Sequence, residues 1–367
     1  MKRIVFTLIN DLTYDQRMHR IAYSLTQAGY GVSLIGRLLP HSIPLESKPY
    51  QQSRLRLLFR RGKAFYLEYN LRLLLFLLRS PFDAVCATDL DTLPACFLAA
   101  FIKGKKCIYD AHEIFPEMPE VVRRPLVQQV WRWAERYLVP RVRQGYTVSS
   151  GLSRYFQNQY GVCYEVIRNV PLLHENAAPI PNTRNPHEPP IIIYQGALNE
   201  GRGLECLIAV MAQIPAQLWL AGEGDLSQQL RALVQRLGVQ EKVRFLGRIP
   251  PAQLPSLTRT AYVGVNLLSG PSLNYRLSLA NKFFDYVHAA VPQVTMNYEE
   301  YRRHNEEFEV ALLIDRTESH TVHQALMRLL TDLPLYQHLH RQCLLARQHW
   351  NWQQEQQKLL QLYRRWL

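Results

Sequence analysis

Short apolar runs alternate with longer amphipathic stretches through most of the chain. The short runs have the length of buried β-strands, and the longer stretches carry apolar residues at helical spacing. Strands that alternate with helices are typical of parallel sheets covered by helices. In the first half, the pattern predicts strands over 3–9, 32–36, 84–87, 107–109, 145–148 and 164–167, and helices over 16–28, 67–78, 92–101, 126–142 and 152–159.

The alternation stops between Pro171 and Pro190, a stretch with six prolines and little hydrophobic pattern. Such a stretch is typical of an interdomain linker. A second alternation follows, with strands predicted over 191–194, 217–221, 243–246, 263–267, 293–296 and 311–314, and helices over 203–212, 226–237, 252–258, 279–289 and 320–330.

The predicted fold is therefore α/β, with two Rossmann-like doubly wound domains that face each other across a cleft. The first domain covers residues 1–170, the linker 171–190 and the second domain 191–349. A terminal helix over 350–367 is expected to cross the junction and pack on the first domain, with capping of its own domain as the alternative. Ligands of such sheets bind beyond the carboxyl ends of the strands, which places the expected site in the cleft.

Composition excludes several other classes of protein. With 367 residues, 47% of them hydrophobic and 20% charged, the chain is neither disordered, collagen-like nor a small disulfide scaffold. The six cysteines are scattered without a CxxC pair, which argues against a zinc site or a redox dithiol and favours a reducing compartment.

The apolar runs are too short for targeting or membrane-spanning segments. The run over 3–9 stops at Asn10-Asp11 without a small-residue cleavage site, so it predicts a strand and no signal peptide. No run approaches the roughly 20 residues that a membrane-spanning helix needs. We therefore expect a cytoplasmic protein that is soluble or attached peripherally to the inner face of the cell membrane.

A large positive charge suggests an anionic partner. Lys and Arg number 43 against 30 Asp and Glu, which gives a net charge of +13. Basic residues interleave with leucines and aromatic residues over 54–79, and a second basic stretch covers 123–143. This pattern predicts contact with an anionic membrane surface, chiefly through Arg54, Arg56, Arg60, Arg61 and Lys63. A solvated basic face or a dimer contact is the alternative; nucleic-acid binding is disfavoured because no nucleic-acid module is recognisable.

Two glycine-bearing loops follow predicted strands of the second domain. The first holds Gly196, Gly201 and Arg202 before a helix, and the second holds Gly222 and Gly224. Exposed backbone N–H groups at a helix start, with an arginine beside them, suit a diphosphate. Tight strand–helix turns also use glycine, so the first loop by itself is equally consistent with an ordinary turn, and the second by itself fits an ordinary turn better.

A third motif, over 274–286, is the most informative. A polar loop leads into a helix whose first turn holds Asn281 and Lys282, with Asp285 one turn further on. A helix N-terminus with a lysine binds phosphate, and a carboxylate one turn in can accept ribose hydroxyls. The alternative is an N-capped helix with an internal Lys282–Asp285 pair. We favour the binding site and expect Lys282 to face solvent when no ligand is bound.

A fourth motif lies in the first domain. His112 and Glu113 follow a predicted strand, and Asp89 ends the preceding one, so all three belong to the same edge of the sheet. A histidine among carboxylates serves proton transfer or recognition of sugar hydroxyls. A histidine with a purely structural role is the alternative.

Together these motifs resemble bacterial glycosyltransferases of the GT-B fold, of the family 4 type that builds cell-surface polysaccharide or modifies lipid carriers. The resemblance rests on residues 10–17, 109–113, 195–205 and 279–286, and covers nearly the whole chain. It implies transfer of a sugar from a nucleotide diphosphate sugar to an acceptor hydroxyl, with retention at the anomeric carbon. It also implies that no metal or other cofactor is needed, because basic residues and a helix N-terminus stabilise the leaving diphosphate.

The resemblance also implies roles for individual residues. Arg202 and Lys282 would bind the diphosphate, Asp285 the ribose, and residues 247–249 the base. His112 would contact the transferred sugar, while Glu113, Asp11 and Asp89 would lie towards the acceptor. The residues assigned to catalysis are therefore His112, Glu113, Arg202 and Lys282, and those assigned to the donor are Gly196, Gly201, Gly222, Gly224, Gly247, Arg248, Ser278, Leu279, Asn281 and Asp285.

Two departures from the family pattern keep alternatives open. Leu277 stands where many relatives have a first glutamate, and Ala197 stands where many have an arginine. The missing acid makes backbone groups of residues 278–281 stronger candidates for contact with the donor. A sugar-nucleotide epimerase of the same fold and a non-catalytic partner subunit are the two rival interpretations.

Overall fold

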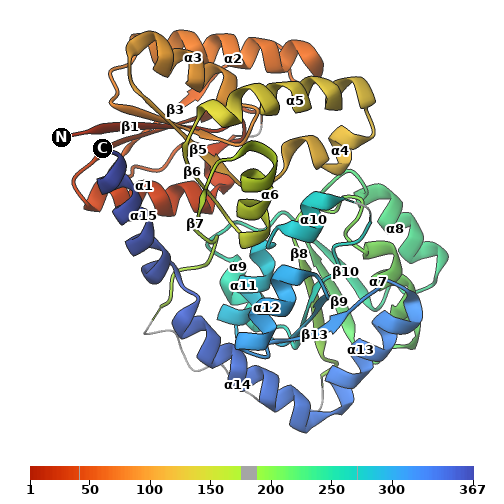
Figure 1. The fold of residues 1–367 in the computed structure, drawn as a ribbon. Coiled ribbons are helices and arrows are strands. Elements are labelled where there is room, and N and C mark those ends of the chain that lie inside the picture. Colours follow the sequence, from red (N-terminus) through yellow and green to blue (C-terminus); the bar gives the residue numbers. More distant parts are fainter. Residues whose placement is uncertain (41, 175–187, 271) are drawn as a thin grey trace. The chain divides into compact units, whose positions relative to one another are not determined.

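The structure is a computed structural model that describes residues 1–40, 42–174, 188–270 and 272–367. It divides into two compact units, one of residues 1–169 with 354–367 and one of residues 170–353 (Figure 1). Most of the predicted linker, residues 175–187, lies outside the described residues.

The first unit is built on a seven-stranded parallel sheet with strand order β3-β2-β1-β4-β5-β6-β7. Its strands are β1 (Arg3–Thr7), β2 (Gly31–Arg37), β3 (Gln51–Leu55), β4 (Ala84–Thr88), β5 (Lys106–Ala111), β6 (Gln144–Thr147) and β7 (Glu165–Val166). Its helices are α1 (Gln16–Gln27), α2 (Gly62–Arg79), α3 (Leu93–Lys103), α4 (Pro119–Val122), α5 (Pro125–Leu138), α6 (Ser150–Tyr160) and α15 (Trp352–Trp366, from residue 354 on).

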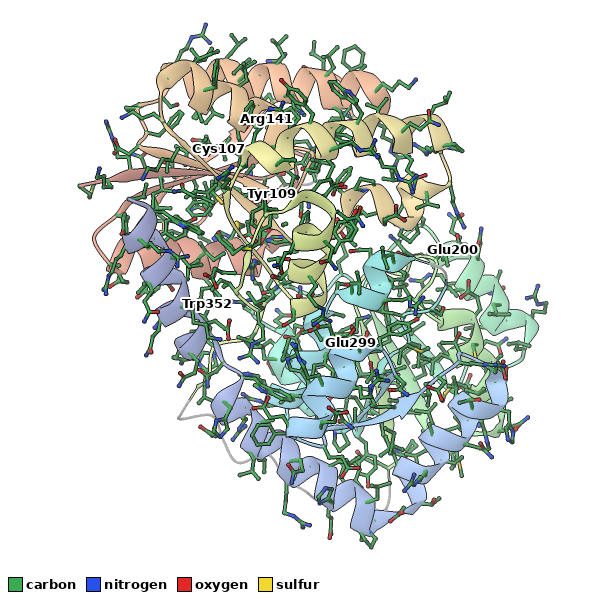
Figure 2. All side chains as sticks on the ribbon, in the orientation of Figure 1. Cys107, Tyr109, Arg141, Glu200, Glu299 and Trp352 are labelled. Carbon is green, nitrogen blue, oxygen red and sulfur yellow. The ribbon has the colours of Figure 1, made fainter. Side chains whose placement is uncertain are left out.

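Helices cover both faces of this sheet because its central strands are apolar on both sides. All five residues of β4 are buried. Tyr109 of β5 lies inside the unit (Figure 2), and the centroid of its ring is 6.1 Å from that of Phe156 in α6. Within this unit, α2, α3 and α5 lie on one face, and α1 and α15 lie on the other (Figure 1).

The last helix, α15, completes the first unit from the far end of the chain. Its Glu355 is fully buried and accepts hydrogen bonds from the backbone N–H and guanidinium of Arg168 at 2.7–2.9 Å. Its Tyr363 ring packs near Phe6 of β1 and Tyr146 of β6. Trp350, which was assigned to the same helix, instead belongs to the core of the second unit.

The second unit holds a six-stranded parallel sheet with strand order β10-β9-β8-β11-β12-β13. Its strands are β8 (Ile191–Gln195), β9 (Gln217–Ala221), β10 (Val243–Gly247), β11 (Val263–Asn266), β12 (Gln293–Met296) and β13 (Ala311–Ile314). Its helices are α7 (Leu204–Val210), α8 (Ser227–Arg236), α9 (Leu254–Arg259), α10 (Leu273–Leu277), α11 (Asn281–His288), α12 (Glu299–Glu307), α13 (Ser319–Thr331) and α14 (Leu333–His349).

The core of the second unit fixes the position of α11. Phe283, Phe284 and Val287 are buried, as their spacing predicted, and pack with Trp350. The buried Tyr286 hydroxyl donates to the backbone oxygens of Ile193 and Val265, both at 3.2 Å. These contacts hold the start of α11 near the carboxyl end of β8, so the prediction of a two-sheet α/β fold is confirmed and the most informative motif is placed in it.

Candidate functional site

Two loops of the second unit meet where β8 and β9 end. The N–H of Gly196 donates to the carbonyl of Ala221 at 2.9 Å, and a Cβ on Gly222 would lie 1.9 Å from the Gly196 oxygen. Gly222 also has φ +153°, which side chains rarely adopt. The contact between the two loops therefore requires glycine at this position, whether or not a ligand is bound.

Two other predicted glycines are explained by packing in the same way. A Cβ on Gly201 would lie 2.8 Å from Cε2 of Tyr275, and one on Gly224 would lie 2.3 Å from Oδ1 of Asn199. At Gly247 the surroundings are more open, since the nearest atom to such a Cβ would be 3.9 Å away. Of these three positions, Gly247 is the one where a ligand has room to approach the backbone.

Lys282 is buried, which corrects the expectation that it faces solvent. It is 7% exposed, and its Nζ lies 3.6 Å from the centroid of the Tyr194 ring. The side chain turns inward because α11 begins beside the end of β8, next to Gly196, whose Cβ would lie 3.4 Å from Nζ. Burial, together with the positive charge of Arg202, holds the pKa of Lys282 well below its ordinary value, while Asp285 opposes this shift. A buried ammonium is costly unless an anion joins it.

Arg202 is the second cation at this place. Its guanidinium stacks 4.9 Å from the centroid of the Tyr275 ring. Its Nε is buried and has no hydrogen-bond partner among the described residues. The positive charges of Lys282 and Arg202 act on each other, and the buried Nε of Arg202 is a hydrogen-bond donor. Such a pair of cations is suited to bind a diphosphate.

Asp285 lies one turn into α11 and takes part in a polar network. Its Oδ2 accepts a hydrogen bond from Nε2 of Gln195 at 2.8 Å, and Oε1 of Gln195 accepts one from Thr258 at 2.8 Å. Gln195 is buried at the last position of β8. The network fixes the direction of the Asp285 carboxylate, which is half-buried.

The remaining residues assigned to the donor are spread around the start of α11 and the end of β10. Asn281 and Arg248 are exposed, and Ser278 is half-buried. Leu279 is 5% exposed and packs in the core with Tyr275, so only its backbone could contact a ligand.

In the first unit, His112 lies between two carboxylates. Its Nε2 lies 3.0 Å from Oδ1 of Asp110, and its Nδ1 lies 3.5 Å from Oδ2 of Asp89. Asp89 also accepts a hydrogen bond from the backbone N–H of His112 at 2.9 Å. Burial opposes the charged imidazolium, but the charges of Asp110 and Asp89 outweigh it and raise the pKa of His112 to about 9.

Asp110 is held in turn by a buried arginine of α1. Arg17 Nη2 lies 3.0 Å from Asp110 Oδ1, its Nε donates to Asp110 Oδ2 at 3.3 Å, and its Nη1 donates to the Ile167 carbonyl. Asp110 is fully buried, yet the charges of Arg17 and His112 hold its pKa below the ordinary value despite that burial. This array keeps His112 a cation. Its Nε2 is buried and faces Asp110, so a sugar hydroxyl could be met only at Nδ1.

Asp11 is paired within the first unit. Its Oδ1 lies 2.6 Å from Nη2 of Arg54, and it also accepts hydrogen bonds from Thr13 and Ser42. Burial opposes its charge, but these hydrogen bonds and Arg54 hold the pKa of Asp11 below its ordinary value. The Arg54 side chain is only 7% exposed, so Arg54 is removed from the set expected to meet a membrane.

The motifs left several of these residues unassigned. Five residues contact the assigned side chains but were given no role of their own: Arg17, Asp110, Tyr194, Gln195 and Thr258. A carboxylate at the end of a strand that is otherwise buried is a signal that could have singled out Asp110. Its pairing with Arg17 joins positions 93 residues apart, which local spacing does not reveal.

Glu113 follows His112 and is half-buried. Across the residues that the structure describes, no group of three His, Cys, Asp or Glu side chains is placed to hold a metal ion. Nor does any helix in the described ranges combine the length and apolar character needed to cross a membrane.

Comparison with known proteins identifies the class. Residues 179–343 match the family Glycosyl transferases group 1, and residues 16–171 match Glycosyltransferase Family 4. With the two parallel sheets, these matches show that the chain belongs to the GT-B-fold glycosyltransferases of the family 4-like group.

Curated relatives match over short regions. The lipopolysaccharide core biosynthesis glycosyltransferase LpsE of Rhizobium meliloti is 36% identical over 63 residues, which is 17% of this chain and 18% of that protein. An uncharacterized glycosyltransferase MJ1607 of Methanocaldococcus jannaschii is 38% identical over 79 residues, 20% of each chain. The matched region thus spans about a fifth of these relatives' length.

Solved structures match over the whole length. Sucrose-phosphate synthase from Thermosynechococcus elongatus has a TM-score of 0.82 at 17% identity, covering 100% of this chain and 99% of that one. HepE of Anabaena, solved with UDP and glucose, has a TM-score of 0.73 at 14% identity, covering 98% and 99%. WaaG, a glycosyltransferase involved in lipopolysaccharide biosynthesis, has a TM-score of 0.74 at 15% identity, covering 97% and 98%. At these identities the likeness concerns the fold.

Proposed function

We propose that the protein transfers a sugar from a uridine diphosphate sugar to a hydroxyl of a glycan or lipid-linked acceptor. The transfer proceeds with retention at the anomeric carbon and without a metal ion, in the synthesis of cell-surface polysaccharide or glycolipid. The bond between the anomeric carbon and the diphosphate breaks, a bond to the acceptor oxygen forms, and the acceptor's proton is released.

The observation that carries the proposal is the pair of cations formed by Lys282, at the start of α11, and Arg202, whose charge acts on it. Lys282 is buried against the Tyr194 ring, and Arg202 keeps a buried Nε without a partner among the described residues. A departing diphosphate is an anion that would neutralise both cations. Its negative charge grows as the bond between the sugar and the diphosphate breaks. Cations fixed in place before the reaction stabilise that developing charge, as a metal ion would.

The other assignments follow from the surroundings of each residue. The Asp285 carboxylate, fixed by Gln195, is assigned to the ribose hydroxyls. The open backbone at Gly247 and the exposed Arg248 are assigned to the base. His112, held as a cation by Asp110 and Asp89, is assigned to a hydroxyl of the transferred sugar, whereas Glu113 and Asp11 remain assigned to the acceptor side.

Uridine is proposed as the base because HepE of Anabaena, which has the same fold, was solved in complex with UDP and with UDP-glucose. A thermal-shift series with UDP, GDP, ADP and dTDP tests this choice. UDP is expected to raise the melting temperature most, and a larger shift with another nucleotide would contradict uridine as the base.

The activity is tested by incubating the protein with a panel of UDP-sugars, with and without a bacterial lipid extract. Release of UDP that depends on the extract supports transfer. Isomerised donor without an acceptor would instead indicate an epimerase, and no turnover by a well-folded protein would indicate a non-catalytic subunit. Arg202→Met should reduce UDP release by at least about a hundredfold. Arg236→Met, a change at an exposed arginine of the same unit, is the matched control.

A further inference from the structure

We propose that the outer surface of the α2, α3 and α5 layer docks on an anionic lipid bilayer. This layer covers one face of the first unit's sheet (Figure 1). Neighbouring helices touch within it: the Tyr66 ring of α2 lies 5.3 Å from the Trp131 ring of α5, and Lys103 of α3 donates to carbonyls at the end of α2. The inference concerns where the protein acts and does not depend on the donor site.

An unpartnered apolar stripe runs along α2. Leu67, Leu71 and Leu75 are 73%, 55% and 42% exposed. Each is two positions from a buried residue such as Tyr69 or Leu73, and two positions correspond to about 200° around a helix, so the stripe faces away from the core. Lys63 and Arg79 are exposed and continue the same four-residue spacing at its two ends.

A second stripe runs along α5. Leu126, Val130, Trp133 and Tyr137 are 73%, 62%, 69% and 47% exposed and are spaced by three or four residues. The Trp133 and Tyr137 rings stack at 5.8 Å, and the guanidinium of Arg141, just beyond α5 (Figure 2), lies 3.9 Å from the centroid of the Tyr137 ring. Amphipathic rings of this kind are favoured at membrane–water boundaries.

The third helix adds apolar area at its end. Phe101 and Ile102 of α3 are 76% and 58% exposed. They precede Lys103, which binds the carbonyl oxygens of Leu77 and Ser80 at the end of α2. Exposed apolar side chains therefore lie on all three of these touching helices, and a surface patch of such side chains is typical of an interaction site.

The charges around the stripes select a lipid partner. Between residues 56 and 82 there are six basic residues and one acid, Glu68, which is tied to Arg72 and to backbone N–H groups. Between residues 122 and 143 there are six arginines and one acid, Glu135, which is buried. Apolar side chains that enter the headgroup region, flanked by cations, match a bilayer rich in acidic phospholipid. A second copy of the chain would bring these like charges together.

Co-sedimentation of the full chain with vesicles tests the proposal. Binding is expected to vesicles of phosphatidylcholine with phosphatidylglycerol, and to be much weaker with phosphatidylcholine alone. Replacing Arg56, Arg60, Arg61 and Lys63 by Gln should weaken binding at least about tenfold. The matched control replaces Arg236, Arg244, Arg302 and Arg316, all exposed in the second unit, and should leave binding unchanged.

The apolar contribution is tested separately. Leu67, Leu71 and Leu75 changed together to Ser should weaken vesicle binding at least about tenfold. The same change at Leu237, Leu333 and Leu345, exposed leucines of the second unit, is the control. All six tryptophans lie in the described residues, and among them only Trp133 is largely exposed. If the Trp133 ring enters the headgroup region, the tryptophan fluorescence should shift to the blue when anionic vesicles are added.

Three results would overturn the proposal. Wild-type protein that stays in the supernatant with anionic vesicles is one, and equal loss of binding in the control variants is another. A dimer in solution that the leucine changes dissociate would assign the surface to a second copy. The stabilisation by UDP should persist in every variant, so failure here is distinguishable from failure of the donor site.

Discussion

The ammonium of Lys282 lies 3.6 Å from the centre of the Tyr194 ring, at the point where α11 begins beside the end of β8. The ring's negative face partly offsets the charge that burial disfavours. The rest of the free-energy cost of a buried ammonium, which the charge of Arg202 increases, destabilises the ligand-free protein.

Lys282→Met should make the ligand-free protein more stable and abolish turnover. The substitution removes a buried amine whose charging is opposed by burial and by Arg202, which is expected to raise the free energy of unfolding by about 1 kcal/mol. Chemical denaturation measures this change, and UDP should no longer raise the melting temperature of the variant. A variant that is less stable than the wild type and still responds to UDP would contradict the assignment.

UDP binding should take up a proton at Lys282. The pKa of Lys282 is lowered in the free protein, and a bound diphosphate favours the charged ammonium and raises that pKa. Between the two values, binding is accompanied by protonation. Calorimetry in buffers of different ionisation enthalpy measures the uptake, best above about pH 7, where the terminal phosphate is fully ionised. Lys282→Met should show none of it, whereas equal uptake in the variant would assign the proton elsewhere.

Activity should fall as the pH rises through about 9, because the imidazolium of His112 is lost there. Asp89→Asn removes one of the carboxylates that raise this pKa, so the alkaline limb of the pH profile should move to lower pH. Asparagine tolerates the positive φ of Asp89, which is 60°, so the backbone should be preserved. Asp225→Asn, an exposed position in the second unit, is the control and should leave the profile unchanged.

The same histidine should make stability depend on pH. The folded pKa of His112, about 9, exceeds its ordinary value of 6.5. Its stabilising contribution is therefore complete below about pH 6.5 and is lost as the pH rises through about 9. In His112→Gln, the difference between the free energies of unfolding at pH 6 and at pH 9 should shrink, and an unchanged difference would argue against the ion-pair array.

Gly222→Ala should disrupt the junction of the β8 and β9 loops. The added Cβ would lie 1.9 Å from the Gly196 oxygen, so we expect a loss of at least about 2 kcal/mol of stability, together with weaker UDP binding. Gly238→Ala is the matched control, since Gly238 has φ +67° and open space around it. It should cost about 1 kcal/mol and leave UDP binding intact. Equal effects of the two changes would show that the loop contact is unimportant.

Glu355→Ala should destabilise the first unit by about 3 kcal/mol, because it leaves the guanidinium of Arg168 without the buried carboxylate that binds it. Glu165→Ala breaks the exposed pair with Arg365 in the same unit and should cost less than about 1 kcal/mol. Urea denaturation of both variants provides the comparison.

The hydrophobic pattern predicted most buried elements. It missed the edge strand β3, the polar helix α12 and also helix α14, in which Tyr336, Leu339 and Cys343 are buried. The strands of both sheets with continuous apolar runs were predicted within a few residues, because burial on both faces leaves an unbroken signal. The edge strand Gln51–Leu55 was missed since none of its residues is fully buried. Helix α12, over Glu299–Glu307, was missed because it is almost entirely polar.

At the site, the position of Lys282 at a helix start was enough to predict a phosphate-binding role. It was not enough to predict that the side chain is buried. That burial depends on the neighbouring end of β8, 87 positions earlier at Gln195, which only the tertiary fold brings close. Arg54 was assigned to the surface for the same reason: its partner, Asp11, is 43 residues away. Sequence patterns reveal a residue's own element far better than the partner that neutralises it.

The position of α15 has a consequence for synthesis on the ribosome. The second unit is one continuous stretch, residues 170–353, whereas the first needs residues 354–367 to cover Tyr146 and satisfy Arg168. During translation, most of the first unit is therefore synthesised before the second unit. Its apolar face stays uncovered until the second unit and α15 have left the ribosome. The nascent first unit is consequently the part of the chain that a chaperone would have most reason to shield.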